Sequence, residues 1–142
     1  MATFQSKATF EAPIEKVYDL MADITKAPNW ITGLQKIEPL SGTPGQAGFE
    51  ARYIFEENGK TVLFQEKVTK VDPYKYMAFQ LEGPNINMQT EAHFKNLGDR
   101  TEVLYVNKAK GSNLGMKIFL PLLKSMMKKR QQADFEKFRS LL

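Results

Sequence analysis

The chain has 142 residues, of which 42% are hydrophobic and 25% are charged, and its formal net charge is +4. This length favours one domain, residues 1–142, that can bury a sizeable core, and the absence of cysteine excludes disulfides and thiolate metal sites. No apolar run reaches the ~18–20 residues of a membrane span, and the N-terminus lacks the apolar segment of a signal peptide. We therefore expect a cytoplasmic protein.

The N-terminal segment predicts one strand followed by two short helices. Polar and apolar residues alternate over 3–10, which indicates a strand. Pro13 suits the first turn of a helix over 13–21, because its missing N–H needs no partner there. A second short helix is expected over 26–31, and it carries Trp30.

Strands separated by tight turns fill the middle of the chain. Asn58-Gly59 and Gly98-Asp99 are typical two-residue hairpin loops, because type I′ turns require positive φ, which Asn, Asp and Gly tolerate. Between these and the other turn signals, the pattern predicts six strands, over residues 34–40, 49–56, 60–71, 76–82, 86–95 and 101–110.

The hairpin loops also determine which side chains share a face of the sheet. Counting outward from the first loop pairs Tyr53 with Phe64, and counting outward from the second pairs Ala92 with Tyr105. One face is then mostly apolar and must be covered. It comprises Phe49, Ala51, Tyr53, Phe55, Val62, Phe64, Glu66, Val68, Met77, Phe79, Leu81, Met88, Thr90, Ala92, Phe94, Val103, Tyr105 and Asn107.

Residues 114–142 form one long amphipathic run that can cover this face. Its expected inner stripe comprises Met116, Phe119, Leu120, Leu123, Met126 and Met127. Because methionine adapts to irregular gaps, this stripe favours a cavity between helix and sheet. Pro121 should kink the helix or divide it after Leu120. We expect the segment before Pro121 to be the more mobile end and to act as a lid.

Three local motifs occur in a characteristic order along the chain. They are Phe-Glu-Ala-Pro-Ile-Glu-Lys-Val-Tyr-Asp-Leu-Met-Ala-Asp at 10–23, Pro-Asn-Trp at 28–30 and Val-Thr-Lys-Val-Asp-Pro at 68–73. With the order of strand, two short helices, six strands and long helix, they resemble the START / polyketide cyclase-dehydrase superfamily (SRPBCC, helix-grip) over essentially the whole chain.

This resemblance implies an α+β helix-grip fold, in which a curved seven-stranded antiparallel sheet wraps around a long C-terminal helix, with two short helices after the first strand. It also implies a cavity between sheet and helix that binds lipids, sterols, polyketides or other apolar molecules. Some members of the superfamily are cyclases or hydrolases and others are transfer proteins or partner-binding modules. The resemblance therefore indicates a fold and a ligand class, not an activity.

The residues that we expect to bind the ligand come from the inward face of the sheet, the inner stripe of the helix and the mouth of the cavity. They are Trp30, Ala51, Tyr53, Phe64, Glu66, Met77, Phe79, Leu81, Met88, Thr90, Ala92, Tyr105, Asn107, Met116, Phe119, Leu120, Leu123 and Met127.

Glu66 is the one catalytic candidate. An inward carboxylate without a cationic partner should have a raised pKa, and it could act as an acid, a base or a hydrogen-bond anchor. Alternatively, a bulge turns it outward, or Arg52 or Lys70 pairs with it. The inward tyrosines and Asn107 could supply proton-transfer or oxyanion groups, or the tyrosines could simply pack with their hydroxyls bonded to backbone.

We expect no metal and no cofactor. His93 is the only histidine, and the register turns it away from the cavity. A lone histidine in a chain without cysteine is not a zinc site, and from the outer face it cannot form a Ser-His-Asp triad in the cavity.

The excess positive charge lies on the last segment, where residues 114–142 carry seven basic and two acidic side chains. A solvated outer face explains this pattern. The alternative is weak contact with an anionic membrane through Lys124, Lys128, Lys129 and Arg130. Nucleic acid is not expected, because the basic cluster lacks interleaved exposed aromatic residues and matches no known module.

Three functions follow from these patterns. The first is a non-enzymatic carrier or sensor of a hydrophobic small molecule, acting as a monomer or homodimer. The second is a cyclase- or hydrolase-type enzyme that uses Glu66 with inward tyrosine or asparagine. The third is an interaction module whose basic C-terminal helix contacts an anionic membrane or protein. The continuous apolar face, without a triad or metal set, favours the first.

Overall fold

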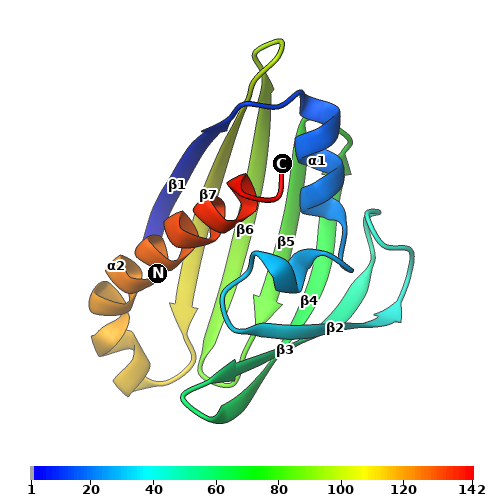
Figure 1. Ribbon diagram of the computed structural model, residues 1–142. Helices are drawn as coiled ribbons and strands as arrows, with labels where there is room; N and C mark the ends of the chain where they lie inside the picture. Colours follow the sequence, from blue (N-terminus) through cyan, green and yellow to red (C-terminus); the bar gives the residue numbers. More distant parts are fainter. Residues whose placement is uncertain (1) are drawn as a thin grey trace.

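The computed structural model describes residues 2–142 and has an α+β helix-grip fold (Figure 1). Its elements are β1 (Ala2–Phe10), α1 (Ile14–Ala22), the 3-10 helix η1 (Ala27–Asn29), β2 (Leu34–Ser41), β3 (Glu50–Glu57), β4 (Lys60–Asp72), β5 (Tyr76–Glu82), β6 (Ile86–Asn96), β7 (Thr101–Gly111) and α2 (Leu114–Arg139). Within residues 2–142, no helix is both long and apolar enough to cross a membrane.

The seven strands form one antiparallel sheet in the order β1-β7-β6-β5-β4-β3-β2. Strands β2 to β7 follow one another as neighbours, whereas β1 pairs with β7 at the far side. The long helix α2 crosses one face of the sheet beside β1 and β7. The helices α1 and η1 cover the same face near the C-terminal end of α2 (Figure 1).

The observed register confirms the pairing inferred from the hairpin loops. Tyr53 pairs with Phe64 across β3 and β4, and Ala92 pairs with Tyr105 across β6 and β7. The first loop has φ of 52° at Asn58 and 76° at Gly59, as a type I′ turn requires. Because the register is as predicted, the inward face of the sheet is also largely as predicted.

A β-bulge in β4 changes which side chains of this strand lie on the inner face. Uninterrupted alternation would place Lys70 opposite Met77 on the inner face. The register instead shifts between Val68 and Lys70, so that Val71 pairs with Met77 and packs against the core. Lys70 lies with its Nζ 5.6 Å from the centre of the Tyr76 ring. The extra residue of a bulge re-aims the side chains that follow it, and here it keeps a lysine out of the interior.

Two predictions about helices were wrong in detail. The second short helix, expected over 26–31, is a single 3-10 turn, Ala27–Asn29. The last helix runs unbroken over Leu114–Arg139, so Pro121 does not divide it after Leu120, whereas the alternative, a kink at Pro121, stays a prediction. Pro121 is exposed, so the carbonyl of Lys117, which loses its helical N–H donor, is open to hydration. The greater mobility of the segment before Pro121 stays a prediction.

The predicted inner stripe of α2 is only partly correct. Leu120 is buried, and Met116, Leu123 and Met127 are half-buried. Phe119 and Met126, however, are 61% and 59% exposed. This part of the helix has apolar side chains on both of its sides, so helical spacing alone does not identify the side that faces the sheet.

The C-terminal end of α2 is anchored by aromatic packing. Phe138 is fully buried, with its ring centre 5.0 Å from that of Phe10 and 5.1 Å from that of Trp30. Arg139 donates a hydrogen bond of 2.6 Å to the carbonyl of Thr9. In contrast to this half of the helix, the first half packs mainly through Leu120.

The start of α2 is held close to the end of β7 by a glycine and a cap. A Cβ at Gly111 would lie 2.9 Å from the backbone nitrogen of Lys117, so a side chain there would push the first turn away. Asn113 caps the helix, since its Oδ1 accepts a 2.8 Å hydrogen bond from the backbone N–H of Met116.

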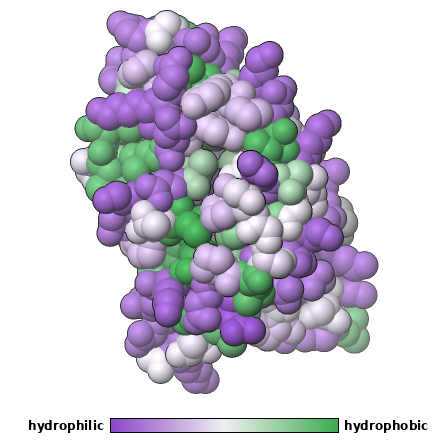
Figure 2. All heavy atoms as spheres, turned by 90° about the vertical axis from the view of Figure 1, so that its right-hand side faces the viewer, coloured by the Kyte–Doolittle hydropathy of each residue, from purple (hydrophilic) through white to green (hydrophobic). Residues whose placement is uncertain are grey.

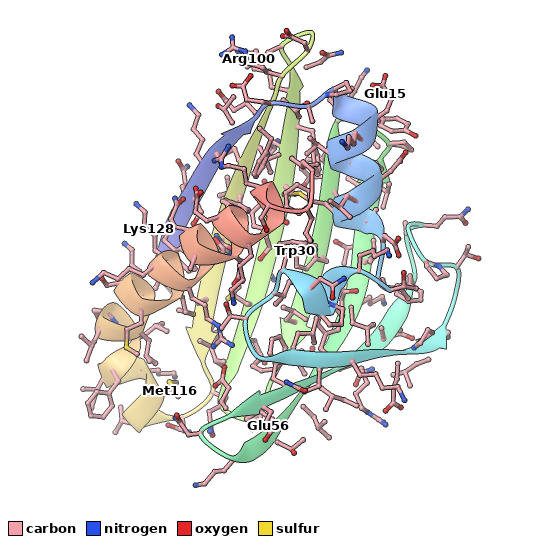
Figure 3. All side chains as sticks on the ribbon, viewed as in Figure 1. Glu15, Trp30, Glu56, Arg100, Met116 and Lys128 are labelled. Carbon is pink, nitrogen blue, oxygen red and sulfur yellow. The ribbon has the colours of Figure 1, made fainter. Side chains whose placement is uncertain are left out.

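The surface of the molecule is predominantly polar in the view of Figure 2, where hydrophobic residues form separate patches among hydrophilic ones. Side chains on the two sides of α2 point in different directions. Lys128 projects from α2 on the side away from η1, whereas Trp30, at the end of η1, lies beside the C-terminal part of α2 (Figure 3).

Candidate functional site

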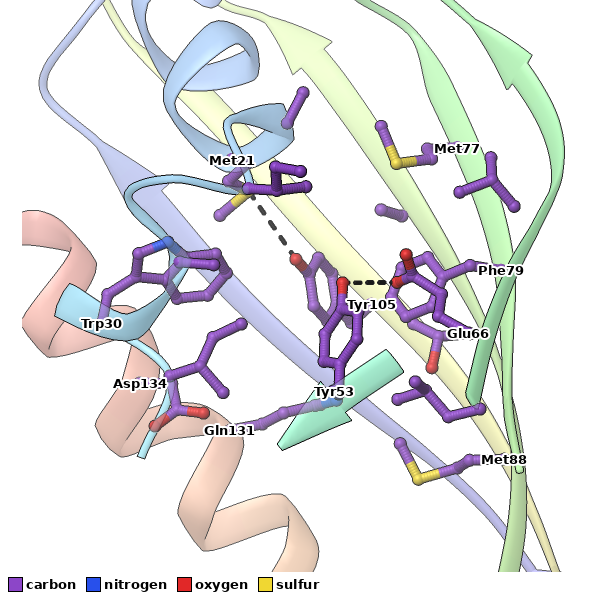
Figure 4. A pocket seen from close by; sticks show the side chains of 18 of the residues that line it. Met21, Trp30, Tyr53, Glu66, Met77, Phe79, Met88, Tyr105, Gln131 and Asp134 are labelled. Atoms are coloured by element: carbon purple, nitrogen blue, oxygen red, sulfur yellow. Dashed lines mark hydrogen bonds between the residues drawn. The ribbon is translucent and has the colours of Figure 1, made fainter. Parts of the chain in front are cut away.

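A cavity of about 220 Å³ lies between the inner face of the sheet, the C-terminal half of α2 and the segment containing α1 and η1. This far exceeds the roughly 10–15 Å³ that a single water needs. Most of the wall is apolar, and Figure 4 shows the few polar groups that interrupt it. The resemblance implied a cavity between sheet and helix, and this pocket lies in that position.

Eleven of the residues expected to bind ligand lie in the cavity wall. They are Trp30, Tyr53, Glu66, Met77, Phe79, Leu81, Met88, Thr90, Ala92, Tyr105 and Met127. Tyr53 and Phe79 therefore lie on the same side of the sheet, as the register required. Whether these residues contact a ligand stays a prediction.

Seven of the expected residues lie outside the wall: Ala51, Phe64, Asn107, Met116, Phe119, Leu120 and Leu123. Ala51 is fully buried in the core. Phe64 packs against Gly83, where a Cβ would come within 2.4 Å of its ring. The four residues of α2 precede Met127, the first residue of that helix to reach the cavity, and Phe119 faces solvent.

Glu66 projects into the cavity from the middle of β4. It is only 5% exposed, and its Oε2 accepts a 2.6 Å hydrogen bond from the hydroxyl of Tyr53. Burial raises the pKa of Glu66 to about 7, against the smaller lowering effect of that hydrogen bond. Glu66 is therefore not turned outward by a bulge. Arg52 pairs with Glu38 and Lys70 lies over the ring of Tyr76, so neither cation pairs with Glu66.

The two inward tyrosines keep their hydroxyl protons at neutral pH. Burial, followed by the charge of Glu66, holds the pKa of Tyr53 well above its usual value, and burial likewise raises the pKa of Tyr105. The Tyr105 hydroxyl lies 3.8 Å from Sδ of Met21, which is a weak acceptor. Neither hydroxyl is bonded to backbone, contrary to one of the alternatives considered above.

Glu66 and Tyr105 thus each present a polar atom with unused hydrogen-bonding capacity. Within residues 2–142, no donor is bonded to Oε1 of Glu66, and the hydroxyl of Tyr105 has only the sulfur contact. Figure 4 shows the hydroxyl of Tyr53 directed at Glu66 and that of Tyr105 directed at Met21. A ligand that pairs with these atoms would satisfy groups that are costly to leave unpaired in an apolar site.

Asn107 does not belong to this polar group, which corrects the prediction that placed it in the cavity. Thr90 donates a 2.9 Å hydrogen bond to its Oδ1, and its Nδ2 donates to Oε1 of Gln131 at 2.9 Å. It also donates to the carbonyl of Phe4 at 3.4 Å. Asn107 is fully buried with its amide engaged, so it ties β6, β7, β1 and α2 together and is not available as an oxyanion donor.

The sequence analysis missed a polar cluster where α2 meets the segment between η1 and β2. Asp134 accepts hydrogen bonds from the backbone N–H and the hydroxyl of Thr32, at 3.0 and 2.6 Å. Arg130 donates to the carbonyl of Thr32 at 2.6 Å and forms an ion pair with Glu57, and Lys137 donates to the Thr32 hydroxyl at 2.9 Å. We call these five residues the Thr32 cluster.

Two members of the Thr32 cluster, Arg130 and Asp134, also lie in the cavity wall. Burial raises the pKa of Asp134, although its bonds with Thr32 and the nearby cations oppose this. The i,i+4 spacing of Arg130 and Asp134 puts both on one side of α2, but their partner Thr32 is about a hundred residues away in sequence. The sequence alone offered no signal for that pairing.

Trp30 both packs in the core and lines the cavity. Its side chain is 5% exposed and packs edge-on against Phe138, and it also forms part of the cavity wall. Its Nε1 is buried without a hydrogen-bond partner among the described residues. No group of three or more His, Asp or Glu side chains that could hold a metal occurs within residues 2–142.

The antiparallel sheet with the long helix α2 packed across one face defines a helix-grip protein. The chain matches, over residues 1–142, the profile of a family described as polyketide cyclase / dehydrase and lipid transport, and it belongs to this family. No curated protein matches the chain significantly.

Solved structures support the same fold at low sequence identity. A START superfamily protein from Mycobacterium smegmatis is 14% identical with a TM-score of 0.80, over 97% of this chain and 94% of that one. The Zhui aromatase/cyclase from Streptomyces sp. R1128 is 15% identical with a TM-score of 0.75, over 99% and 96%. A conserved protein from Geobacillus kaustophilus is 16% identical with a TM-score of 0.83, over 98% and 93%.

Proposed function

We propose that the protein binds and carries a hydrophobic small molecule, of lipid, sterol or polyketide type, in the cavity between the sheet and α2. The observation that supports this most directly is a mostly apolar cavity of about 220 Å³ with few polar groups in its wall. Sites for small molecules are usually built in this way, with the polar groups fixing the orientation of the ligand. The description of the family includes lipid transport, which agrees with this proposal.

The polar groups of the wall indicate what the ligand carries. A ligand hydroxyl can donate to Oε1 of Glu66 and accept from the hydroxyl of Tyr105. A ligand carboxylate is disfavoured, because Glu66 and Asp134 both line the cavity and the nearby guanidinium of Arg130 is already paired with Glu57. We therefore expect an uncharged ligand with at least one hydroxyl group, rather than a free fatty acid.

Native mass spectrometry of gently purified protein tests this proposal, followed by extraction and identification of the bound molecule. Titration with a neutral apolar dye such as Nile red measures the affinity of the same cavity for an apolar molecule. Ala92→Phe adds a ring within the wall and should weaken dye binding at least tenfold. Ala78→Phe is the matched control, because Ala78 precedes Phe79 on β5 and faces the other side of the sheet.

Because Ala92 is tightly surrounded, Met88→Trp provides a second way to fill the cavity from a half-buried position. Weaker dye binding in both cavity variants, with unchanged binding in Ala78→Phe, supports the proposal. Full-strength binding in folded Ala92→Phe and Met88→Trp would contradict it.

An enzyme of the aromatase/cyclase type is the second candidate, and the pairing of Glu66 with Tyr53 favours it. A carboxyl group with a pKa of about 7 can both donate and accept a proton near neutral pH. The loss of Asn107 as a site residue reduces this candidate to Glu66, Tyr53 and Tyr105. A related fold is found in an aromatase/cyclase, but that likeness concerns the fold alone.

The identity of the molecule bound to Glu66→Gln separates the two candidates. A carrier should contain the same compound in the wild-type and Glu66→Gln proteins. An enzyme should accumulate unreacted substrate in the variant, so that the extracted compounds differ in mass or chromatographic retention. Identical compounds in comparable amounts would exclude a reaction that depends on Glu66.

A further inference from the structure

The N-terminal half of α2 exposes a row of large hydrophobic side chains on the side opposite the sheet. Leu114, Ile118, Leu122 and Met126 are 73%, 68%, 64% and 59% exposed, and Phe119 beside them is 61% exposed. The first four follow one another at i,i+4 spacing, which aligns them along one side of the helix. We call these five residues the outer stripe.

The outer stripe is distinct from the inner side of the same helix. Leu120 is 5% exposed and faces the sheet, and at about 100° per residue Ile118 and Leu122 point almost directly away from it. Elsewhere in residues 2–142, the exposed large hydrophobic side chains Leu40, Leu63, Tyr74 and Leu141 belong to separate elements. Scattered apolar residues are normal on a protein surface, but a contiguous row indicates an interaction site.

Positive charge accompanies the outer stripe and no negative charge opposes it. Lys117, Lys124, Lys128 and Lys129 are all exposed, and no acidic residue occurs over 114–133. Arg130, which the sequence analysis grouped with these lysines, is instead engaged in the Thr32 cluster. Lys117 and Lys124 therefore lie among the exposed apolar side chains, and Lys128 and Lys129 directly follow them along α2.

We propose that the outer stripe and its lysines dock the protein on the surface of an anionic lipid bilayer. In this arrangement α2 lies in the plane of the interface, with the stripe inserted between headgroups and the lysines contacting anionic lipid. Apolar insertion combined with electrostatic attraction is how interfacial helices bind membranes. The absence of acidic residues over 114–133 favours this occupant over a second copy of the chain, whose stripe would bring the same lysines together.

Docking through α2 would bring the cavity wall to the membrane. The same helix contributes Met127, Gln131 and Phe135 to the wall, and its C-terminal end stays anchored by Phe138. A bilayer that holds the first half of α2 could therefore assist the exchange of a ligand with the cavity. Membrane docking does not depend on the proposed ligand binding, and each can be measured without the other.

Flotation with liposomes of neutral phosphatidylcholine, with and without 30% phosphatidylglycerol, tests this proposal. Binding should require the anionic lipid and should decrease steeply when salt is raised to 0.5 M, because salt screens exposed charges. The triple variant Lys124→Gln, Lys128→Gln, Lys129→Gln should lose about a hundredfold in partition coefficient, since each lysine contributes roughly fivefold. A matched triple, Lys60→Gln, Lys67→Gln, Lys108→Gln, changes the net charge equally on exposed strand positions and should lose far less.

The apolar part of the stripe has its own test. Ile118→Gln with Leu122→Gln should weaken flotation about tenfold or more, because two aliphatic side chains that would insert into the bilayer are lost. Leu40→Gln with Leu63→Gln removes two hydrophobic residues that are 46% and 47% exposed, and it should float like the wild-type protein. Nile red binding should be unchanged in both double variants.

Three results would overturn this proposal. The first is equal flotation with neutral and anionic liposomes, and the second is full flotation of the Ile118→Gln, Leu122→Gln variant. The third is absent flotation together with a wild-type dimer, in sedimentation experiments, that the same variant converts to monomer. The third result would assign the outer stripe to contacts between copies of the chain.

Discussion

Glu66 carries an energetic cost that depends on pH. Its ordinary pKa is 4.5, and burial raises it to about 7 in the folded protein. Below pH 4.5 the carboxyl group is protonated in both states and no stability difference arises. As the pH rises toward and through 7, the unfolded chain releases the proton first, so that folding becomes less favourable. The difference of about 2.5 between the two pKa values lowers the free energy of unfolding by roughly 3 kcal/mol at high pH.

We therefore predict that Glu66→Gln removes a pH-dependent destabilisation. The amide keeps the shape and can still accept from Tyr53, but it carries no ionisable proton. The free energy of unfolding of the variant relative to wild type should rise by about 2 kcal/mol between pH 5 and pH 8, measured by urea denaturation. Glu82→Gln, at an exposed position in β5, should show no such change. An equal pH dependence in wild type and Glu66→Gln would contradict the placement of this side chain.

The inward position of Glu66 could be predicted from sequence, whereas the polar cluster around Thr32 could not. Glu66 lies seven residues after the hairpin loop Asn58-Gly59, and strict alternation carries the register that far. Asp134 and Arg130 resemble solvent-facing helix residues, and only the distant Thr32 and Glu57 determine that they face inward. Local patterns specify orientation within an element, but they do not specify a partner in another element.

At the scale of elements, the two halves of α2 have different environments. The C-terminal half is anchored by Phe135 and Phe138, which are 1% and 0% exposed. Sequence periodicity predicted a helix but assigned Phe119 to its inner side, because both sides of the first half are apolar. The bulge in β4 was likewise not predictable, since Lys70 and Val71 differ in polarity but nothing in the local sequence marks an inserted residue.

Paired phenylalanine substitutions test this orientation of α2. Phe138→Ala should lower the free energy of unfolding by about 3–5 kcal/mol, because it leaves a cavity in a packed core. Phe119→Ala should change it by no more than about 0.5 kcal/mol, as expected for an exposed site. Chemical denaturation of both variants measures the difference. Similar losses for the two variants would mean that the first half of the helix is packed as tightly as the second.

Because of Pro121, we expect the first turns of α2 to be less stable than its other end. A proline in a helix interior costs about 3 kcal/mol relative to alanine. We predict that amides over 114–120 exchange faster than those over 135–139, and that Pro121→Ala slows exchange in the first range. Hydrogen-exchange mass spectrometry gives both rates, and Ser125→Ala is a control that removes no backbone restraint. Equal protection of the two ranges in the wild-type protein would contradict this prediction.

At the scale of the whole molecule, an empty cavity lowers stability and an occupied one raises it. A ligand that binds only the folded state adds about 2.7 kcal/mol at a free concentration one hundred times its Kd. For a domain of this size, extraction of the bound molecule should then lower Tm by roughly 10 °C. Calorimetry before and after delipidation measures this shift, and adding back the extracted compound should restore Tm. An unchanged Tm after verified extraction would contradict tight binding in the cavity.

The whole fold was more predictable than its binding site. Seven strands, their register and the covering helix follow from alternation, hairpin loops and one long amphipathic run. The size of the cavity depends instead on how far α2 is held from the sheet by Asn107, Gln131 and the Thr32 cluster. Those contacts join residues far apart in the chain, so composition and periodicity contain little information about them.

The pairing of β1 with β7 also affects how the protein is made on the ribosome. Within residues 2–142, β1 pairs only with β7, about one hundred residues later, which at 5–20 residues per second corresponds to a delay of roughly 5–20 s. Meanwhile the meander from β2 to β6 can assemble from local hairpins, and its apolar inner face stays uncovered until α2 is synthesised. A nascent chain of this topology thus offers its future interior to the surrounding solution before closing it, and a cargo molecule could be captured during synthesis.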